Sequence, residues 1–424
     1  MRKRSKHAAL LVVATVALTT ACSSSGNGGE GEDGVVTLTI STFNEWGYSD
    51  LLTEYEELNP GIKVEHNRFA TTDEAKEQFQ TALGAGSGLA DVVGVDNSWL
   101  PEIVEYSDGF ADLNSDSVEG RWNDWTTDLA TTPDGKLLGY ATDIGPQVIA
   151  YRADLFEAAG LPTDREQVEE LFGGADATWE DFFTVGDQFM AAGTGPAFYD
   201  AAESVANAQL DQREITFEDP ESGELIGTTS DEVREIYDNT LAHNDLSAHL
   251  ARWTEDWNTA FQTDGFAAML APSWMLGVIE GNAAGVEGWD VANVFPGGGV
   301  NSGGSYLTVP TTSEHPEEAQ ALADWLTAPE QQLKAFQTTG NFPSQVEAQE
   351  GEDLQQVTSA FFNDAPTGEI FSEQASRISV VPFKGMNYFA ALTYFDNAIR
   401  SVDVDGQDAS KAWDQFVNDV ETLE

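Results

Sequence analysis

The segments VVTLTIST at residues 35–42 and ADVVGV at residues 90–95 determine the predicted architecture of this chain. The first alternates and is β-branched, as in a strand, and the second is the short apolar run of a buried parallel strand. Another strand is predicted at Ile62–Phe69, and helices are predicted at Tyr48–Leu58 and Asp73–Leu83. The order βαβαβ indicates an α/β protein with a doubly wound sheet.

A second set of similar elements follows and predicts a second α/β lobe. Strands are predicted at Pro146–Tyr151, Phe266–Leu270, Trp289–Phe295 and Tyr306–Pro310. Helices are predicted at 153–159, 179–192, 231–243 and 255–262, twice between 316 and 338, and from 390 onward. No fixed-period repeat is present, so the chain is predicted to form two globular lobes rather than a solenoid.

Three predicted strands end in small polar or acidic residues followed closely by tryptophan. In chain order these ends are Asn44-Glu45-Trp46, Asp96-Asn97-Ser98-Trp99 and Pro272-Ser273-Trp274. In open α/β sheets, ligands bind beyond the carboxyl ends of the strands. Tryptophan is costly to expose, so its repeated placement at loop edges predicts a ligand-binding cleft.

Sugar is the ligand that fits this combination of side chains. A pyranose has an apolar C–H face that lies against an aromatic ring, while Asp, Glu and Asn bond its hydroxyl groups. Trp46, Trp99 and Trp274 are therefore expected to line the cleft, with Glu45 and Asp96 bonding hydroxyls. The alternative reading is that the tryptophans pack beneath loops as core residues.

The charge of the chain excludes several classes of partner. It holds 73 acidic and 19 basic residues, which gives a formal net charge of -54. Such a surface repels nucleic acid and polyanionic ligands, because binding them takes Lys and Arg in number. After the first 21 residues, no segment approaches the roughly 18 uninterrupted apolar residues of a membrane span.

The usual catalytic and cofactor motifs are missing from the sequence. It contains no G-x-S-x-G, no G-x-x-x-x-G-K-[ST] and no G-x-G-x-x-G after a strand. The five histidines are scattered without a metal-ligand spacing, and residues 403–408 match a calcium loop only in part. We therefore expect no catalytic residue, no metal site and no cofactor.

The first 34 residues indicate export and attachment to a membrane. A basic head at residues 2–6 and an apolar run at residues 8–18 are typical of a signal peptide, predicted here at residues 1–21. Cys22, the only cysteine, follows small residues and resembles the acylated cysteine of a bacterial lipobox. Lipoboxes usually carry Leu where this chain has Thr19. The alternative is an ordinary signal peptide with an incidental cysteine.

The residues that follow the cysteine have the composition of a tether. Residues 23–34 read SSSGNGGEGEDG, which is typical of a flexible, solvated segment. Residues 22–34 are therefore expected to form a lipid-anchored linker. Such a linker would hold the globular body on the outer face of the cytoplasmic membrane.

Several segments, taken in order and spacing, resemble a known family over nearly the whole of the predicted mature chain. They include LNPGIKV (58–64), ADVV (90–93), YRADLF (151–156), TWEDF (178–182), GFAAM (265–269), SW (273–274) and GGSYLTVP (303–310). The chain resembles the extracellular solute-binding lipoproteins of bacterial ABC importers, a family that includes maltose- and oligosaccharide-binding proteins. PGGG (296–299) and APSWM (271–275) are similar to the cellobiose-type members from Gram-positive bacteria.

The resemblance implies a two-lobed, type II periplasmic-binding-protein-like fold with a hinge, an interlobe cleft and no catalysis. The N-lobe is expected to comprise residues 35–143 and 305–345, and the C-lobe residues 144–304 and 346–424. The hinge is expected where the chain crosses between the lobes. Closure of the lobes around the ligand would then signal that the receptor is loaded.

The resemblance also adds residues at the crossings to the expected binding site. Asp143 lies where the chain first crosses and is expected to bond sugar hydroxyls, as Glu45 and Asp96 are. Gly303 and Gly304 lie where the chain returns, and Asn341 lies in a further cleft loop. Glycine at a crossing permits backbone rotation and lets backbone amides approach the ligand. The full predicted ligand set is Asn44, Glu45, Trp46, Asp96, Asn97, Trp99, Asp143, Trp274, Gly303, Gly304, Ser305 and Asn341.

The favoured function is that of an anchored, monomeric receptor that delivers an oligosaccharide to the permease subunits of an ABC importer. Cello-oligosaccharides are the favoured ligands. A receptor for polyamines or other cationic solutes is one alternative, because acidic groups and aromatic rings also hold cations. An exported glycan-active enzyme is another.

Overall fold

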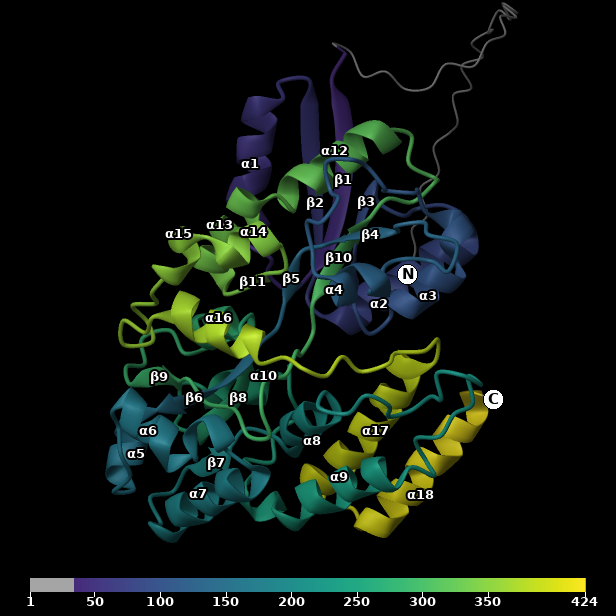
Figure 1. Cartoon of the computed structure of the whole chain (residues 1–424). Coiled ribbons are helices and arrows are strands. Elements are labelled where there is room, and N and C mark those ends of the chain that lie inside the picture. The colour runs from purple at the N-terminus through teal and green to yellow at the C-terminus, as the bar shows by residue number, and fades with distance from the viewer. Residues whose placement is uncertain (1–33, 424) are drawn as a thin grey trace, which may run out of the picture.

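A five-stranded sheet forms the centre of the N-lobe in the computed structural model, which describes residues 34–423 (Figure 1). Its strands are β1 (Val36–Phe43), β2 (Ile62–Phe69), β3 (Val92–Asp96), β4 (Gly139–Ala141) and β10 (Ser305–Thr308). They lie in the order β2-β1-β3-β10-β4. β1 pairs in parallel with β2 and β3, whereas β10 runs antiparallel to β3 and β4. The predicted βαβαβ start of the chain is confirmed.

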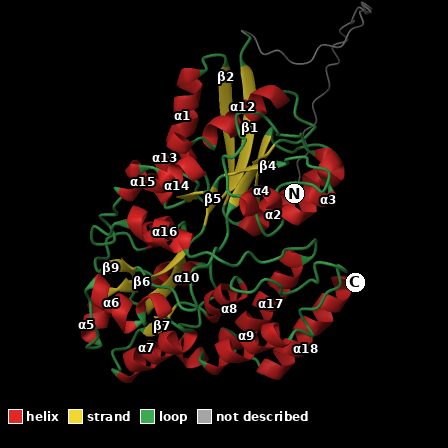
Figure 2. Cartoon of the chain, in the orientation of Figure 1, coloured by secondary structure: helices red, strands yellow, loops and turns green. Residues whose placement is uncertain are grey.

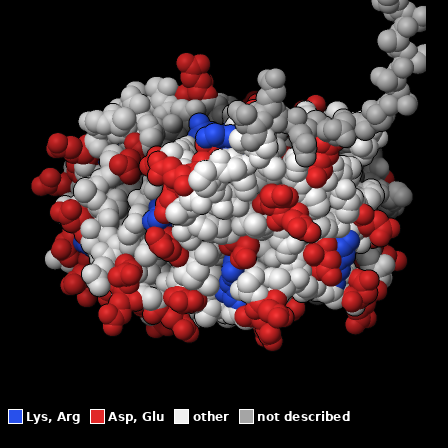
Figure 3. Space-filling view, turned by 90° about the horizontal axis from the view of Figure 1, so that it is seen from above, with Lys and Arg blue, Asp and Glu red and all other residues white. Residues whose placement is uncertain are grey.

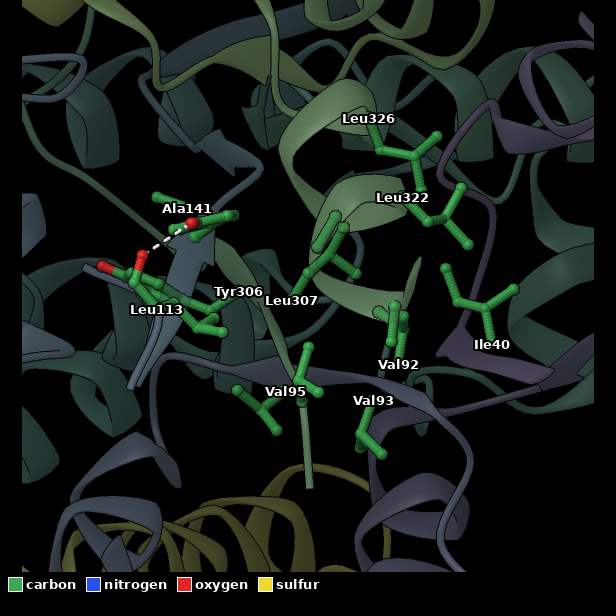
Figure 4. Close-up of a cluster of buried hydrophobic side chains, with 14 of the residues drawn as sticks. Ile40, Val92, Val93, Val95, Leu113, Ala141, Tyr306, Leu307, Leu322 and Leu326 are labelled. Carbon is green, nitrogen blue, oxygen red and sulfur yellow. Dashed lines mark hydrogen bonds between the residues drawn. The ribbon is translucent and has the colours of Figure 1, made fainter. Parts of the chain in front are cut away.

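Helices pack against this sheet and bury its apolar side chains. They are α1 (Tyr48–Leu58), α2 (Thr72–Ala85), α3 (Leu100–Glu105), α4 (Asp124–Leu129) and α12 (Pro316–Leu326). Figure 4 shows Leu322 and Leu326 of α12 close to Leu307 of β10, in a cluster that also includes Ile40 and Val95. Because α12 lies far along the chain from β1, this core ties distant parts of the sequence together.

A four-stranded sheet forms the centre of the C-lobe. Its strands are β6 (Gln147–Arg152), β7 (Ala197–Tyr199), β8 (Phe266–Pro272) and β9 (Trp289–Ala292), in the order β7-β8-β6-β9. β6 is fully buried and has a cluster on each side, one with Phe182 and one with Trp257. Figure 2 shows helices flanking the strands in both lobes.

The C-lobe contains the helices α5 (Ala153–Ala158), α6 (Arg165–Leu171), α7 (Trp179–Ala191), α8 (Ala202–Leu210), α9 (Asp231–Ala242), α10 (Glu255–Ala260) and α11 (Met275–Asn282). Of these, α5, α7, α9 and α10 lie close to predicted positions, whereas α6, α8 and α11 were not predicted. The start of α7 follows from a capping box, in which the Thr178 hydroxyl accepts from the Asp181 amide and the Asp181 carboxylate accepts from the Thr178 amide. Short 3-10 turns lie at Ser107–Gly109, Gly174–Asp176, Asn244–Leu246 and Glu421–Leu423.

The last part of the chain completes the C-lobe with helices. α17 (Tyr388–Asp403) and α18 (Ala409–Val420) pack with α8 and α9 around Phe395 and Phe416, at the lower right of Figure 1. α13 (Pro329–Thr339), α14 (Val346–Glu350), α15 (Glu352–Gln355) and α16 (Thr367–Ser376) lie along the hinge side of the two lobes.

Three segments carry the chain between the two sheets. The first contains β5 (Asp143–Ile144) between β4 and β6, the second joins β9 to β10, and the third contains β11 (Phe342–Pro343). β5 and β11 pair antiparallel as a separate two-stranded sheet. We propose that the lobes divide at 143/144, 304/305 and 345/346, the boundaries expected from the sequence. These positions lie in or next to the crossing segments.

The predicted signal peptide at residues 1–21, Cys22 and all but the last residue of the predicted linker lie outside the described residues. Within residues 34–423, no helix combines the length and the apolar composition needed to cross a membrane.

Candidate ligand-binding site

A cavity with a volume of about 870 Å³ lies between the lobes. Its upper wall is formed by the segment after β1 and by the start of α2, and its lower wall by α8, α11 and α17. Residues from the crossings close its inner end. This volume is in the range of pockets that enclose small organic ligands.

An aromatic pair from the C-lobe faces this cleft. The rings of Trp253 and Trp274 are stacked at a centroid distance of 6.2 Å and an interplanar angle of 19°. Trp253 is 38% exposed, although a ring of this size is usually buried. The indole nitrogen of Trp274 donates to the carbonyl oxygen of Ser302 at 3.0 Å, which fixes the ring against the second crossing. Together the two nearly parallel rings offer apolar aromatic surface to a ligand in the cavity.

The backbone conformation of Trp253 accounts for the exposure of its side chain. Its φ is +66°, in the left-handed region that a non-glycine residue adopts only at a cost. Thr254 follows as the N-cap of α10, and its hydroxyl accepts from the amide of Trp257. The ring of Trp257 packs against Trp253 from below at 5.1 Å and is itself fully buried. The strained turn therefore lifts Trp253 into the cleft while α10 continues into the core.

Trp46 lines the cleft from the N-lobe but is only 4% exposed. Its ring packs edge-on against Phe43 at 5.0 Å and Tyr48 at 5.7 Å. It also lies against Gly94 of β3, where an added Cβ would come within 2.7 Å of the ring. Trp46 therefore supports the wall of the cleft and presents little area to it.

The expectation that Trp99 lines the cleft is wrong. Its side chain is 1% exposed and packs against Phe79 of α2 at 5.2 Å, within the N-lobe core. The cause is the turn before it, where the Asp96 carboxylate accepts from the amide and the hydroxyl of Ser98. This turn reverses the chain into α3, and the indole points beneath the helices instead of into the cleft. For Trp99 the core reading is the correct one.

Asn97 also has a different position from the one expected. It is 4% exposed and does not line the cavity. Its side-chain amide donates to the carbonyl oxygen of Gly303 at 2.5 Å, and its carbonyl accepts from the Lys384 ammonium at 2.6 Å. Asn97 therefore fastens the second crossing to the N-lobe and to the loop before α17.

The remaining predicted ligand residues all line the cavity. They are Asn44, Glu45, Asp96, Asp143, Trp274, Gly303, Gly304, Ser305 and Asn341. Glu45 is exposed at the cleft edge and is ion-paired with Arg68. Asp143 is nearly buried, and burial raises its pKa to about 6, despite hydrogen bonds that lower it. Their presence in the wall places them within reach of a ligand, and their role in binding stays a prediction.

Comparison with known proteins identifies the family. The family of bacterial extracellular solute-binding proteins matches residues 50–362. The chain belongs to this family. The arabinooligosaccharide-binding protein of Bacillus subtilis (strain 168) is 24% identical over 331 residues, covering 73% of this chain and 72% of that protein.

Two solved structures show the fold of this solute-binding protein in relatives. An extracellular solute-binding protein of family 1 is 43% identical, with a TM-score of 0.79 over 91% of this chain and 99% of its own. A binding protein associated with an ABC transporter of B. animalis subsp. lactis Bl-04, in complex with β-1,6-galactobiose, is 20% identical, with a TM-score of 0.76 over 91% and 96% of the chains. The predicted two-lobed, type II fold is confirmed.

The cleft of the solute-binding protein also contains residues that were not predicted from the ends of the strands. Besides Trp253, they form a polar cluster on the C-lobe wall, comprising Glu203 and Asn207 of α8, Arg252, and Asp396 and Arg400 of α17. Burial raises the pKa of Glu203 and raises that of Asp396 well above its ordinary range, while the two arginines oppose both shifts. Four of these residues come from helices and Arg252 comes from the turn before α10, so a reading of strand ends could not find them. The pair Arg252-Trp253 just before an N-cap was the available signal.

The cleft is strongly acidic. Its lining contains eight Asp and Glu residues and two arginines, with no lysine. Figure 3 shows the same imbalance on the upper face of the molecule, where acidic side chains far outnumber basic ones. Among residues 34–423, no group of three or more His, Cys, Asp or Glu side chains is arranged to hold a metal ion. Because the acidic lining repels negative charge, an anionic ligand is disfavoured in this cleft.

Proposed function

We propose that the protein is the oligosaccharide receptor of an ABC importer, which captures its ligand in the interlobe cleft and delivers it to the permease. The observation that carries this proposal is the stacked pair Trp253–Trp274 beside hydrogen-bonding carboxylates and amides in the cleft. An aromatic ring complements the apolar face of a sugar ring, and the polar groups complement its hydroxyl rim. The sugar ligands named for two of the relatives support the same class of ligand.

The lining of the cleft narrows the class of sugar. Eight carboxylates against two guanidinium groups favour a neutral oligosaccharide over a uronic acid oligomer. A cavity of about 870 Å³ has room for a short oligosaccharide and not for a polymer. Cello-oligosaccharides, arabino-oligosaccharides and galactobiose all satisfy these conditions, and cello-oligosaccharides remain the ligands first expected from the sequence.

The acidic lining also favours a second candidate, a receptor for polyamines. Against it, Arg252 and Arg400 lie in the wall that a linear cation would have to follow. In addition, Glu45 is neutralised by Arg68. Fewer carboxylates are thus free to pair with a polycation than the composition suggests.

A binding screen tests the proposal and separates the candidates. Thermal unfolding is measured with cello-, arabino- and galacto-oligosaccharides, a galacturonic acid oligomer and spermidine. A ligand at 100 times its dissociation constant should add about 2.7 kcal/mol to the free energy of unfolding. Stabilisation by a neutral oligosaccharide, lost in Trp253→Ala, supports the proposal, whereas stabilisation by spermidine alone contradicts it. Release of a chromophore from aryl glycosides would instead indicate a glycan-active enzyme.

We further propose that Cys22 is acylated and holds the receptor on the outer face of the cytoplasmic membrane. The position of Cys22 after small residues and an apolar run supports this attachment. Wild-type protein should partition with membranes and into detergent, and Cys22→Ser should release it into the medium. Equal release of both proteins would contradict the proposal.

A further inference from the structure

One carboxylate touches all three segments that cross between the lobes. Asp143 belongs to β5 on the first crossing. Its Oδ1 atom accepts from the backbone amide of Ser305 at 3.1 Å, where the second crossing enters β10. Its Oδ2 atom accepts from the side-chain amide of Asn341 at 3.3 Å, just before β11 on the third crossing. The Thr142 hydroxyl donates to Oδ1 at 2.7 Å.

The backbone around Asp143 is packed as closely as its side chain. β5 and β11 pair antiparallel, with Asp143 opposite Pro343. Gly304 has a φ of +111°, and a Cβ added there would lie 3.0 Å from the carbonyl oxygen of Asp143. Since the side chain of Asp143 is only 5% exposed, solvent competes little for its hydrogen bonds. Hydrogen bonds to a charged group in such surroundings are the stronger kind.

We propose that Asp143 is a positioning residue of the hinge, which sets the relative course of the three crossings, rather than a contact for the ligand. Both of its oxygens already accept from protein donors on the crossings. The inference deepens the proposed function, because it rests on an interlobe cleft that closes around a solute. It also replaces the expectation that Asp143 bonds sugar hydroxyls.

The charge state of Asp143 gives the inference a second readout. Burial raises its pKa to about 6, and Asp96 of β3 adds to the shift. The other titratable groups that face it are Tyr48 of α1 and Tyr306 of β10. Because burial raises this pKa above its value in solvent, protonation favours the buried arrangement of the crossings, and this contribution is lost as pH rises through 6. The crossings should therefore be held more tightly at pH 5 than at pH 7.

Amide hydrogen exchange of the unliganded full-length protein tests the inference directly. Asp143→Asn keeps the shape of the side chain but sets one amide group against another at Asn341. Exchange of the backbone amides in residues 301–305 and 341–344 should become about tenfold faster or more. The double variant Asp143→Asn with Asn341→Asp reverses donor and acceptor, and should restore slow exchange. After correction for intrinsic rates, protection in wild type should fall from pH 5 to pH 7, and this fall should be absent in Asp143→Asn.

Affinity for arabinotriose, used as the sugar probe, separates this inference from the proposed function. Wild-type exchange in Asp143→Asn, together with weaker sugar binding, would overturn the inference and make Asp143 a ligand contact. Faster exchange with rescue by the double variant would support the inference even if no sugar bound, in which case the proposed function alone would fail. If Asp143→Asn does not fold, Asn341→Ala removes the bond between Asp143 and the third crossing, together with the bond that the Thr339 hydroxyl donates to Asn341. That variant should accelerate exchange at residues 341–344, and unchanged exchange there would overturn the inference.

Discussion

The two walls of the cleft use tryptophan in opposite ways. On the N-lobe wall, Trp46 and Trp99 are 4% and 1% exposed and pack into the lobe. On the C-lobe wall, Trp253 is 38% exposed and stacks on the half-buried Trp274. The N-lobe therefore offers mainly carboxylates and amides to a ligand, and the C-lobe offers the aromatic surface.

The difference arises from the turn that precedes or follows each ring. All four tryptophans lie within two residues of the start of a helix, so that position alone does not separate them. On the N-lobe wall the rings turn into the core, where Trp46 packs on Phe43 and Tyr48, and Trp99 packs on Phe79. On the C-lobe wall a left-handed residue holds Trp253 outward, and a hydrogen bond to the second crossing holds Trp274 in place. The local backbone, rather than the position after a strand, decides whether a tryptophan is available to a ligand.

The largest effect should come from Trp99→Ala. Removing a fully buried indole leaves a cavity beside Phe79, and such changes cost about 3–5 kcal/mol of stability. Urea unfolding followed by circular dichroism measures the loss, with Trp253→Ala as the exposed control. A loss below 1 kcal/mol in Trp99→Ala would mean that the two walls do not differ as described.

A buried carboxylate of the C-lobe, Asp211, predicts a pH dependence of folding of the same kind as that of Asp143 at the hinge. Beneath the C-lobe wall, burial raises the pKa of Asp211 to about 6, although Lys384 opposes the shift. A raised carboxyl pKa stabilises the fold below the unfolded value near 4, and this contribution is lost as pH rises through 6. Its size is on the order of 2–3 kcal/mol for a shift of about two pH units.

Replacing Asp211 by Asn should therefore flatten the pH dependence of the free energy of unfolding between pH 4 and 6. The measurement is a series of urea titrations on wild type and variant, and their difference isolates this group from other buried carboxyls. Glu45→Gln on the exposed N-lobe wall is the matched control and should leave the slope unchanged. Parallel curves for wild type and Asp211→Asn would contradict the prediction.

Trp253→Ala should reverse the pattern of Trp99→Ala by weakening binding more than folding. Loss of an aromatic anchor from a desolvated site costs about 1–3 kcal/mol of affinity. Stability should change little, because the ring packs on Trp257 and Trp274 without filling the core. Calorimetric titration with the sugar found in the screen measures the affinity. Trp253→Phe, which keeps a ring, should retain most of it, and equal losses in both variants would contradict the stacking role.

The sequence was sufficient for the fold because strand and helix periodicities are local. The segments around β1, β2 and β3 carry their pattern in a few consecutive residues, and the structure confirms them. The site was predictable only in position, because strand ends locate a cleft but do not give the direction of a side chain after a turn. The prediction for Trp99 was wrong for that reason. Glu203 and Asp396 were not predicted, because they come from two helices that meet only in the folded protein.

The smallest effect should come from Arg68→Ala, which frees Glu45 on the N-lobe wall. The two side chains are 49% and 45% exposed, and an exposed ion pair contributes at most about 1 kcal/mol to stability. Once unpaired, Glu45 can accept from a ligand hydroxyl. The affinity for a neutral sugar should therefore rise, but by less than about threefold, which is under about 1 kcal/mol. Calorimetry at low and high salt measures this, and the small difference should shrink further as salt screens the carboxylate. A loss as large as that of Trp253→Ala would show that the N-lobe wall, and not the aromatic C-lobe wall alone, dominates the binding energy.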